Sequence, residues 1–145
     1  MKVVNSGTTD SYDVTIASFY NTGGGLLATY TLRRTSDVLY LRVQGNGAAS
    51  PATTVTTVST GTLYHVWIKY LKVQTSGDAF ASIAFSEDGV RPTGGNSYAA
   101  TADGTSTTDA ARLYLKASYT SATQGADVIF DHIRVDDATI GDNPS

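Results

Sequence analysis

The sequence contains no cysteine, a single glutamate and only two histidines among its 145 residues. Without cysteine, disulfide bonds and thiolate metal sites are excluded, so stability has to come from side-chain packing and backbone hydrogen bonds. Two histidines cannot build a three-histidine zinc site. The ten Lys and Arg residues are scattered among thirteen Asp and Glu residues. Because no basic cluster is present to attract a phosphate backbone, we expect no nucleic-acid partner.

Long apolar runs are also missing from the sequence. No run approaches the roughly twenty residues of a membrane-spanning helix, so we expect no membrane insertion. The residues after Met1 lack the apolar stretch of a secretory signal, so a secreted form would be a mature or excised piece. The length predicts one domain over residues 1–145, a module or fragment of a longer protein.

The residues that are abundant are Thr, Ser, Gly, Val and Tyr, which is the composition of strands. Apolar and polar residues alternate with a period of two in one segment after another, as expected for strands that cover one face of a core. This alternation predicts eight strands, at residues 11–20, 26–34, 38–44, 53–59, 63–74, 80–86, 111–119 and 127–136. Turn residues separate them, which favours hairpins over helical crossovers and predicts an all-β, antiparallel sandwich. Residues 87–109 hold few large apolar side chains and are predicted to form a long surface loop.

Three segments carry a family resemblance: GTLYHVWIKY at 61–70, AFASIAFSEDG at 79–89 and VIFDHIRVDD at 128–137. In order and spacing they resemble the concanavalin A-like lectin/glucanase (laminin G-like) domains, with Leu63 standing where those domains usually have Trp. The resemblance implies a jelly-roll sandwich of the kind found in extracellular and phage-associated proteins.

The chain departs from that family at its start. Domains of the family carry one or two further strands there, the first of which pairs near the C-terminal strand, and only Lys2–Asn5 is available for this role. Unless these residues supply that strand, the fold lacks its N-terminal strand and the last strand lies at an open edge, which folded proteins normally pair or cover. We therefore expect a longer polypeptide or a strand from a neighbouring chain to complete this edge. The candidate assembly residues are Asp127, Ile129, Asp131, Ile133 and Val135.

Catalytic residues are hard to find in the sequence, and we expect that the protein is not an enzyme. Retaining glycosidases need two carboxyl groups about 5 to 5.5 Å apart. Asp127 and Asp131 would lie roughly 13 Å apart along one strand. No cofactor is expected, but loop carboxylates keep a calcium site open beside the interpretation that Asp caps the turns. The loop carboxylates in question are Asp37, Asp78, Asp88, Asp103, Asp136, Asp137 and Asp142.

The predicted strand at residues 63–74 provides the candidate carbohydrate-binding surface. If Tyr64, Val66, Ile68 and Tyr70 face the core, the opposite face presents His65, Trp67 and Lys69, an indole between two hydrogen-bonding groups. The alternative is that Trp67 is buried under residues 87–109 or in an interface. Two further sets alternate in the same way and are candidates to extend this face: Tyr40 and Arg42, and Arg112, Tyr114 and Lys116. Asp131 shares its side of the last strand with Ile129, Ile133 and Val135, which favours a hydrogen-bonded structural carboxylate.

Two functional classes follow from these features. The first is a non-catalytic recognition module, extracellular or on a virion surface, that binds a glycan or cell-surface polysaccharide. The second is a structural subunit of a fibre, tail or surface layer that contacts copies of itself through its open edge. The fold by itself does not decide between them.

Overall fold

The computed structural model describes residues 1–5, 11–46, 52–72, 79–92, 99–103, 108–118, 127–131 and 133. Within these ranges the chain forms antiparallel β-strands and no helix, as the alternating sequence pattern predicts. The strands are β1 (Lys2–Asn5), β2 (Ser11–Tyr20), β3 (Leu26–Thr35), β4 (Val38–Gly45), β5 (Ala52–Val58), β6 (His65–Tyr70), β7 (Ala79–Ser86), β8 (Ala99–Asp103), β9 (Arg112–Ser118) and β10 (Asp127–Ile129).

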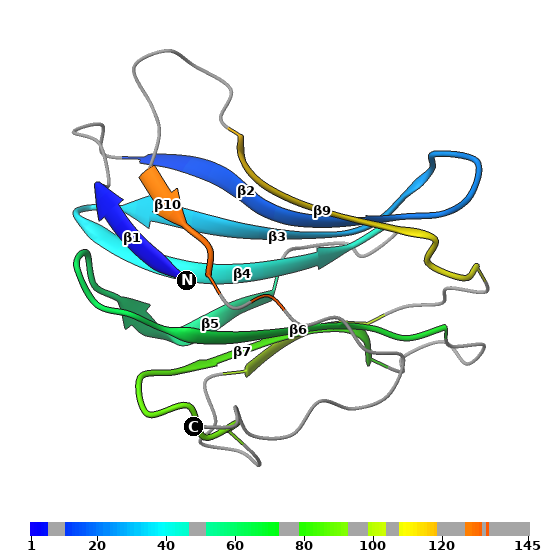
Figure 1. Ribbon diagram of the computed structural model, residues 1–145. Coiled ribbons are helices and arrows are strands. Elements are labelled where there is room, and N and C mark those ends of the chain that lie inside the picture. Colours follow the sequence, from blue (N-terminus) through cyan, green and yellow to red (C-terminus); the bar gives the residue numbers. More distant parts are fainter. Residues whose placement is uncertain are drawn as a thin grey trace.

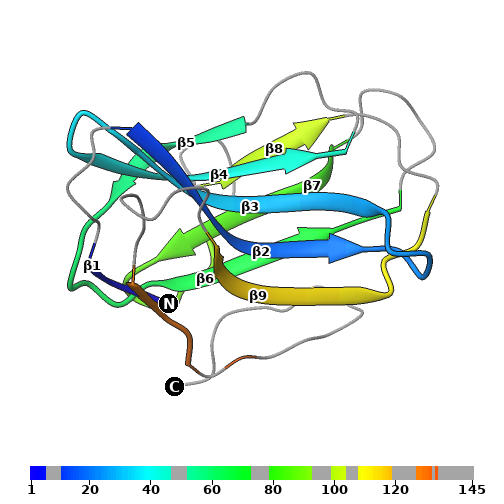
Figure 2. The ribbon, with the colours of Figure 1, turned by 90° about the horizontal axis from the view of Figure 1, so that it is seen from above.

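The strands are arranged as a β-sandwich (Figure 1). One layer is a five-stranded sheet in the order β5-β4-β3-β2-β9, and the other contains a three-stranded sheet in the order β6-β7-β8. Figure 2 shows the first sheet crossing over the second, and β4 contacts both β7 and β8. Each strand of these two sheets therefore has one face toward the other layer and the opposite face directed outward. This is the arrangement that period-two alternation requires.

Strand β1 connects the pair β1-β10 to the layer that contains β6. The Gly61 backbone N–H donates to the Val3 carbonyl at 2.8 Å, and the Tyr64 N–H donates to the Met1 carbonyl at 2.8 Å. On its other side β1 pairs with β10, with Val3 opposite Val128. The chain itself thus supplies the N-terminal strand. The expectation that the last strand is left unpaired is wrong for the edge of β10 that pairs with β1.

The core lies between the two layers and is built from the inward-facing residues of each strand. Its largest fully buried side chains include Tyr30, Phe85, Leu32 and Leu41. The Tyr30 hydroxyl donates a hydrogen bond of 2.7 Å to the Lys69 carbonyl, which ties β3 of one layer to β6 of the other. A buried carbonyl and hydroxyl that satisfy each other cost little to bury, whereas either one left alone costs much more.

The predicted strand positions agree with the structure to within one residue, except at both ends of β6 and at the end of β10. Strand β6 ends at Tyr70, whereas the prediction continued to residue 74. Each of the eight predicted strands corresponds to an observed one, but β6 begins at His65 because Tyr64 is engaged with Met1 ahead of the strand. In β10, the strand ends at Ile129, whereas the prediction continued to residue 136. Residues 132 and 134–136 lie outside the described part of the chain.

The prediction of one long loop at residues 87–109 is wrong, because this segment contains β8. Strand β8 reads AATAD and pairs with β7, with Ala100 opposite Ile83. Strand pairing uses backbone N–H and C=O groups, which every residue here possesses, so no large apolar side chain is required. A run of alanines gives no alternating hydrophobic pattern, and the sequence therefore carried no signal for this strand.

The turn between β3 and β4 is formed by Ser36 and Asp37 and confirms the hairpin predicted between the strands at residues 26–34 and 38–44. Both residues have positive φ, of 48° and 67°, as a two-residue type I′ turn requires. The Arg34 guanidinium donates to the Asp37 carboxylate, which links the end of β3 to the turn. This pair supports a conformation that residues other than glycine adopt at a cost.

We predict that Tyr30→Phe destabilises the fold by about 1–2 kcal/mol, because the Lys69 carbonyl loses its inter-layer donor. Urea denaturation measures this change in the free energy of unfolding. Tyr40→Phe, on the outer face of the same sheet, is the matched control and should change stability by a few tenths of a kcal/mol at most. Equal effects in the two variants would show that the bond between the layers contributes nothing.

We also predict a loss of stability at alkaline pH that depends on Tyr30. Burial raises the pKa of Tyr30 above its ordinary value, and the neighbouring Tyr70 raises it further. The contribution of this group is fully present below about pH 10, where the unfolded chain begins to ionise, and is lost as pH rises toward the folded-state pKa. Denaturation from pH 8 to 11 should show a smaller fall in Tyr30→Phe than in the unmodified protein. Parallel curves for the two proteins would contradict the assignment.

Candidate functional site

The three candidate residues of β6 share one outer face, as the sequence predicted. In the pairing of β6 with β7, Trp67 lies opposite Ala84 and His65 opposite Ser86. The intervening side chains Val66 and Ile68 pack against the core. His65, Trp67 and Lys69 therefore point away from the core together, because alternate residues of a strand share a face.

This outer face is not an open platform for a sugar. Ala84 and Ser86, directly opposite Trp67 and His65, are only 6% and 8% exposed. The His65 and Trp67 rings lie 6.3 Å apart at 33°, so the two side chains also contact each other. Side chains covered to this extent favour the interpretation in which Trp67 is packed rather than presented to a ligand.

Tyr40 and Arg42 do not extend the His65–Trp67–Lys69 face. They lie on β4, where Leu41 is fully buried and faces the core, so both point outward from the five-stranded sheet. That outer surface is on the opposite side of the sandwich from the outer face of β6. The sequence pattern places each residue on one side of its own strand, but it does not say which two strands have their outer faces in common.

Arg42 is also engaged in an ion pair. Its guanidinium lies 3.2 Å from the Asp13 carboxylate, which accepts a second contact of 2.8 Å from Arg33. All three residues lie on the outer face of the sheet, and Arg33 pairs directly with Asp13 across β2 and β3. A guanidinium already bound to a carboxylate is a poor candidate for a free ligand contact.

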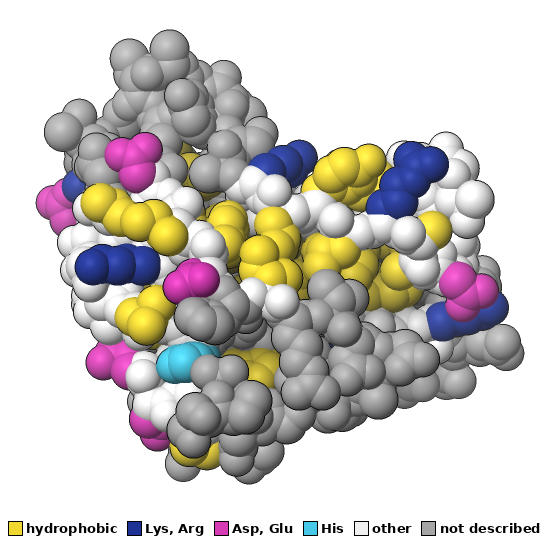
Figure 3. All heavy atoms as spheres, viewed as in Figure 1, with side chains coloured by type: hydrophobic (Ala, Val, Ile, Leu, Met, Phe, Trp, Pro, Cys, Tyr) yellow, Lys and Arg dark blue, Asp and Glu magenta, His cyan; other side chains and the backbone are white. Residues whose placement is uncertain are grey.

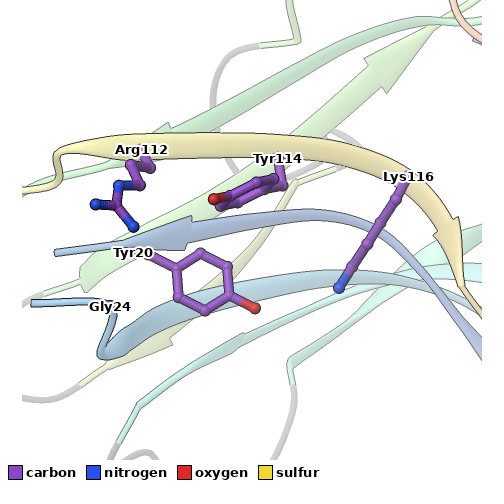
Figure 4. Close-up of a pocket in the computed structure, with 5 residues that line it drawn as sticks. All are labelled: Tyr20, Gly24, Arg112, Tyr114 and Lys116. Carbon is purple, nitrogen blue, oxygen red and sulfur yellow. The ribbon is translucent and has the colours of Figure 1, made fainter. Parts of the chain in front are cut away.

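The third candidate set lines a shallow pocket at the edge of the five-stranded sheet. Arg112, Tyr114 and Lys116 alternate along β9, while Leu113 and Leu115 between them pack against the core. The pocket has a volume of about 310 Å³ and is lined by these three residues together with Tyr20 and Gly24 (Figure 4). The sequence thus placed the β9 residues on a common face, but the expectation that they extend the His65–Trp67–Lys69 face is wrong, because β9 belongs to the other sheet. The sequence also did not identify Tyr20 or Gly24.

A bulge in β2 brings Tyr20 to this surface. Thr15 pairs with Thr31 on the outer face, and after the bulge Ala17 pairs with Tyr30 on the inner face. The extra residue, Ile16, is buried and reverses the alternation, so that position 20 points outward rather than into the core. A strict period-two pattern from Thr15 would have put Tyr20 on the inner face, which explains why sequence analysis missed it.

The hairpin after Tyr20 forms one wall of the pocket. The Asn21 side-chain carbonyl accepts a 2.7 Å hydrogen bond from the Gly25 N–H, and the Gly24 N–H donates to the Asn21 backbone carbonyl at 3.1 Å. Gly24 has a φ of 82°, which favours glycine, and its position leaves the wall without a side chain. At the end of β2, the Tyr20 carbonyl accepts a 2.8 Å hydrogen bond from the Ala111 N–H, the residue just before β9, and this bond fixes where β9 begins.

The two tyrosine rings form the apolar centre of the pocket. Their centroids lie 5.3 Å apart with an interplanar angle of 89°, an edge-to-face contact that orients both rings. Tyr114 is 49% exposed, so a large part of its ring is open to solvent. Arg112 and Lys116 lie on either side of the ring pair (Figure 4). The pocket therefore combines an accessible aromatic surface with hydrogen-bond donors, and the described residues that line it include no carboxylate, thiol or imidazole.

The candidate assembly residues lie on β10 and just beyond it. Asp127 and Ile129 are exposed, while Val128 packs against the core from the other side of the strand. Asp131 and Ile133 are exposed as well, so the side that they share with Ile129 faces outward. Asp131 lies close enough to the Met1 ammonium to raise its pKa, although burial has the larger effect and lowers it. Val135 lies outside the described residues.

The loop carboxylates considered for calcium have other roles where the structure describes them. Asp37 accepts from Arg34. The pKa of Asp88 lies below its ordinary value, chiefly because the Val90 N–H donates a 3.0 Å hydrogen bond to its carboxylate. Asp103 belongs to β8. The remaining candidates, Asp78, Asp136, Asp137 and Asp142, lie outside the described residues.

Two further features are absent from the described part of the chain. No cluster of three or more His, Cys, Asp or Glu side chains in these ranges is arranged to hold a metal ion. Nor do these ranges include a helix of the length and apolar character needed to cross a bilayer. Among the surfaces described above, the pocket between β2 and β9 has the most defined geometry, with two oriented tyrosine rings and a basic side chain on either side of them.

Comparison with known proteins adds no relative: no protein-family model, no curated protein and no solved structure matches this chain.

Proposed function

We propose that this protein is a non-catalytic recognition module that binds carbohydrate at the outer surface formed by β2 and β9. The observation that carries the proposal is the oriented ring pair of Tyr20 and the exposed Tyr114, which lies between Arg112 and Lys116. The electron-rich face of a tyrosine attracts the weakly positive C–H groups of a sugar ring. The flanking donors can hydrogen-bond to sugar hydroxyl groups, which gives the site its orientation.

The scaffold beneath the pocket supports this role. Phe19, the residue before Tyr20, packs against the core from the inner face of β2, and its ring centroid lies 5.9 Å from that of Tyr30 and 5.7 Å from that of Tyr70. Leu113 packs in the same region from β9. Side chains on a rigid, packed sheet lose little conformational freedom on binding, which favours affinity for a ligand as polar as a sugar. We propose, with this site, an extracellular or virion-surface location and a jelly-roll relationship of the concanavalin A-like kind.

We predict that Tyr114→Ala lowers carbohydrate affinity by about tenfold or more, because a stacking ring contributes on the order of 1–2 kcal/mol. A glycan array identifies the ligand, and isothermal titration calorimetry then measures its dissociation constant. Tyr114 is half exposed, so its removal should leave the free energy of unfolding nearly unchanged.

Trp67→Ala is the comparison that locates the site. If sugar binds between β2 and β9, this variant retains the affinity of the unmodified protein, provided that circular dichroism shows it folded. Loss of binding in Trp67→Ala with full binding in Tyr114→Ala would move the site to the outer face of β6. Failure of the protein to bind any carbohydrate on the array would contradict the proposed function.

A second candidate function is self-assembly through the β1-β10 region, and a specific observation favours it. Val4, Leu63, Ile129 and Ile133 are all at least half exposed. Figure 3 shows hydrophobic side chains at the surface over β1 and β10, and in the described residues β10 pairs with β1 alone. Exposed apolar side chains beside a free strand edge are typical of surfaces that pair with another chain. We propose a second copy of this chain as the partner in this alternative.

We predict that, if this alternative holds, the molar mass by light scattering rises with protein concentration and Ile129→Lys keeps the protein monomeric. A charge introduced at an apolar edge has to be desolvated on association, which is costly. The matched control is Val90→Lys, another exposed apolar position outside this region. A monomer at every concentration tested would rule out assembly by this surface.

A further inference from the structure

The positive charges of the pocket are arranged as a row along β9. Arg112, Tyr114 and Lys116 occupy alternate positions, so the Cα atoms of the two basic residues lie about 13 Å apart with the tyrosine midway. Along the upper edge of Figure 3, over β9, a hydrophobic side chain lies between two Lys or Arg side chains. In Figure 4 the two basic side chains extend from opposite ends of the tyrosine pair. The surface therefore offers two separated positive charges with an aromatic surface between them.

These two charges are not neutralised by neighbouring carboxylates in the described part of the chain. The ion pairs found there join Arg33 and Arg42 to Asp13, Arg34 to Asp37, and Lys72 to Asp109. Neither Arg112 nor Lys116 takes part in one. In a protein whose formal net charge is −3, four of the other described cations have an anionic partner, whereas neither cation of the β9 row has one in the described part of the chain. Cations that are left accessible and unpaired are available to an anionic ligand.

We propose, building on the carbohydrate-binding function above, that the ligand is an acidic polysaccharide. A sugar ring contacts Tyr114 and Tyr20, and acidic groups on the sugars to either side of it contact Arg112 and Lys116. The planar guanidinium of Arg112 can donate two parallel hydrogen bonds to a carboxylate or a sulfate, while Lys116 supplies a compact positive charge. Both acidic groups have the oxygen acceptors that this arrangement needs, and the experiment below distinguishes them.

A polysaccharide fits this surface better than a nucleic acid. Binding to a phosphate backbone relies on many basic residues that follow the strand of phosphates. Here only two basic residues line the pocket, and the chain as a whole has thirteen acidic residues against ten basic ones. The sparse spacing of charge matches a polymer whose acidic groups are separated by neutral parts of the sugar chain.

The test compares acidic polymers with neutral relatives by calorimetry at low and at physiological salt. The probes are polygalacturonate, its fully methyl-esterified neutral form, carrageenan, which carries sulfate without carboxylate, neutral galactan, and single-stranded oligothymidylate. We expect at least one acidic polymer to bind about tenfold or more tightly than its neutral relatives, because charged hydrogen bonds are stronger than neutral ones. Added salt should weaken this binding. Preference for polygalacturonate assigns a carboxylate ligand, and preference for carrageenan assigns a sulfate ligand.

Charge-removing variants locate the effect. Arg112→Gln and Lys116→Gln should each reduce the affinity for the acidic polymer by about tenfold, and the preference over the neutral relative should fall with it. Lys2→Gln removes the same charge from β1 in the other layer and should leave the preference unchanged. Circular dichroism and thermal unfolding check that each variant is folded.

The outcomes separate this inference from the function on which it rests. Equal or tighter binding of the neutral polymers would overturn the acidic ligand while leaving carbohydrate recognition in place. A preference for acidic polymers that survives in Arg112→Gln and Lys116→Gln would overturn the assignment to this row. Binding of oligothymidylate as tight as that of the acidic polymers would identify general polyanion binding and also overturn it. No binding of any polysaccharide would contradict both proposals.

Discussion

The packing of two sheets face to face is the constraint on which the other features of this protein depend. Tyr30, at the centre of β3, is fully buried between the layers and donates its hydroxyl to the Lys69 carbonyl of the opposite sheet. With the inward positions occupied by such side chains, every other residue of each strand has to point outward. The outer surfaces, which are the places available for recognition, are therefore determined by the needs of the core.

The pocket between β2 and β9 depends on a bulge in β2, which changes which residues of that strand point outward. Ile16 adds one residue to β2, remains buried itself and turns the rest of the strand over by one position. Tyr20 consequently lies outside the core, beside Tyr114, where the two rings orient each other. Bulges often redirect a side chain toward a functional surface, and this one assembles an aromatic pair from two strands far apart in the sequence.

The two functions proposed for the protein use separate surfaces. The tyrosine pocket lies on the outer face of the five-stranded sheet, whereas the exposed apolar residues Val4 and Ile129 lie over β1 and β10. Because the surfaces do not overlap in the described residues, self-association through β10 would leave the pocket accessible. Recognition of a polymer by many aligned copies would gain avidity without any new contact, so the two properties would reinforce each other.

The sequence by itself determined that the chain forms strands, where most of them begin and end, and which side chains within a strand share a face. These properties follow from alternation and turn residues, which act over a few positions. It did not reveal β8, whose alanines carry no pattern, or Tyr20, whose orientation depends on a bulge. It also grouped Tyr40 and Arg42 with Trp67, although they lie on opposite sides of the sandwich. Only the tertiary structure decided which strands are neighbours, because that choice is made by packing and backbone pairing between distant segments.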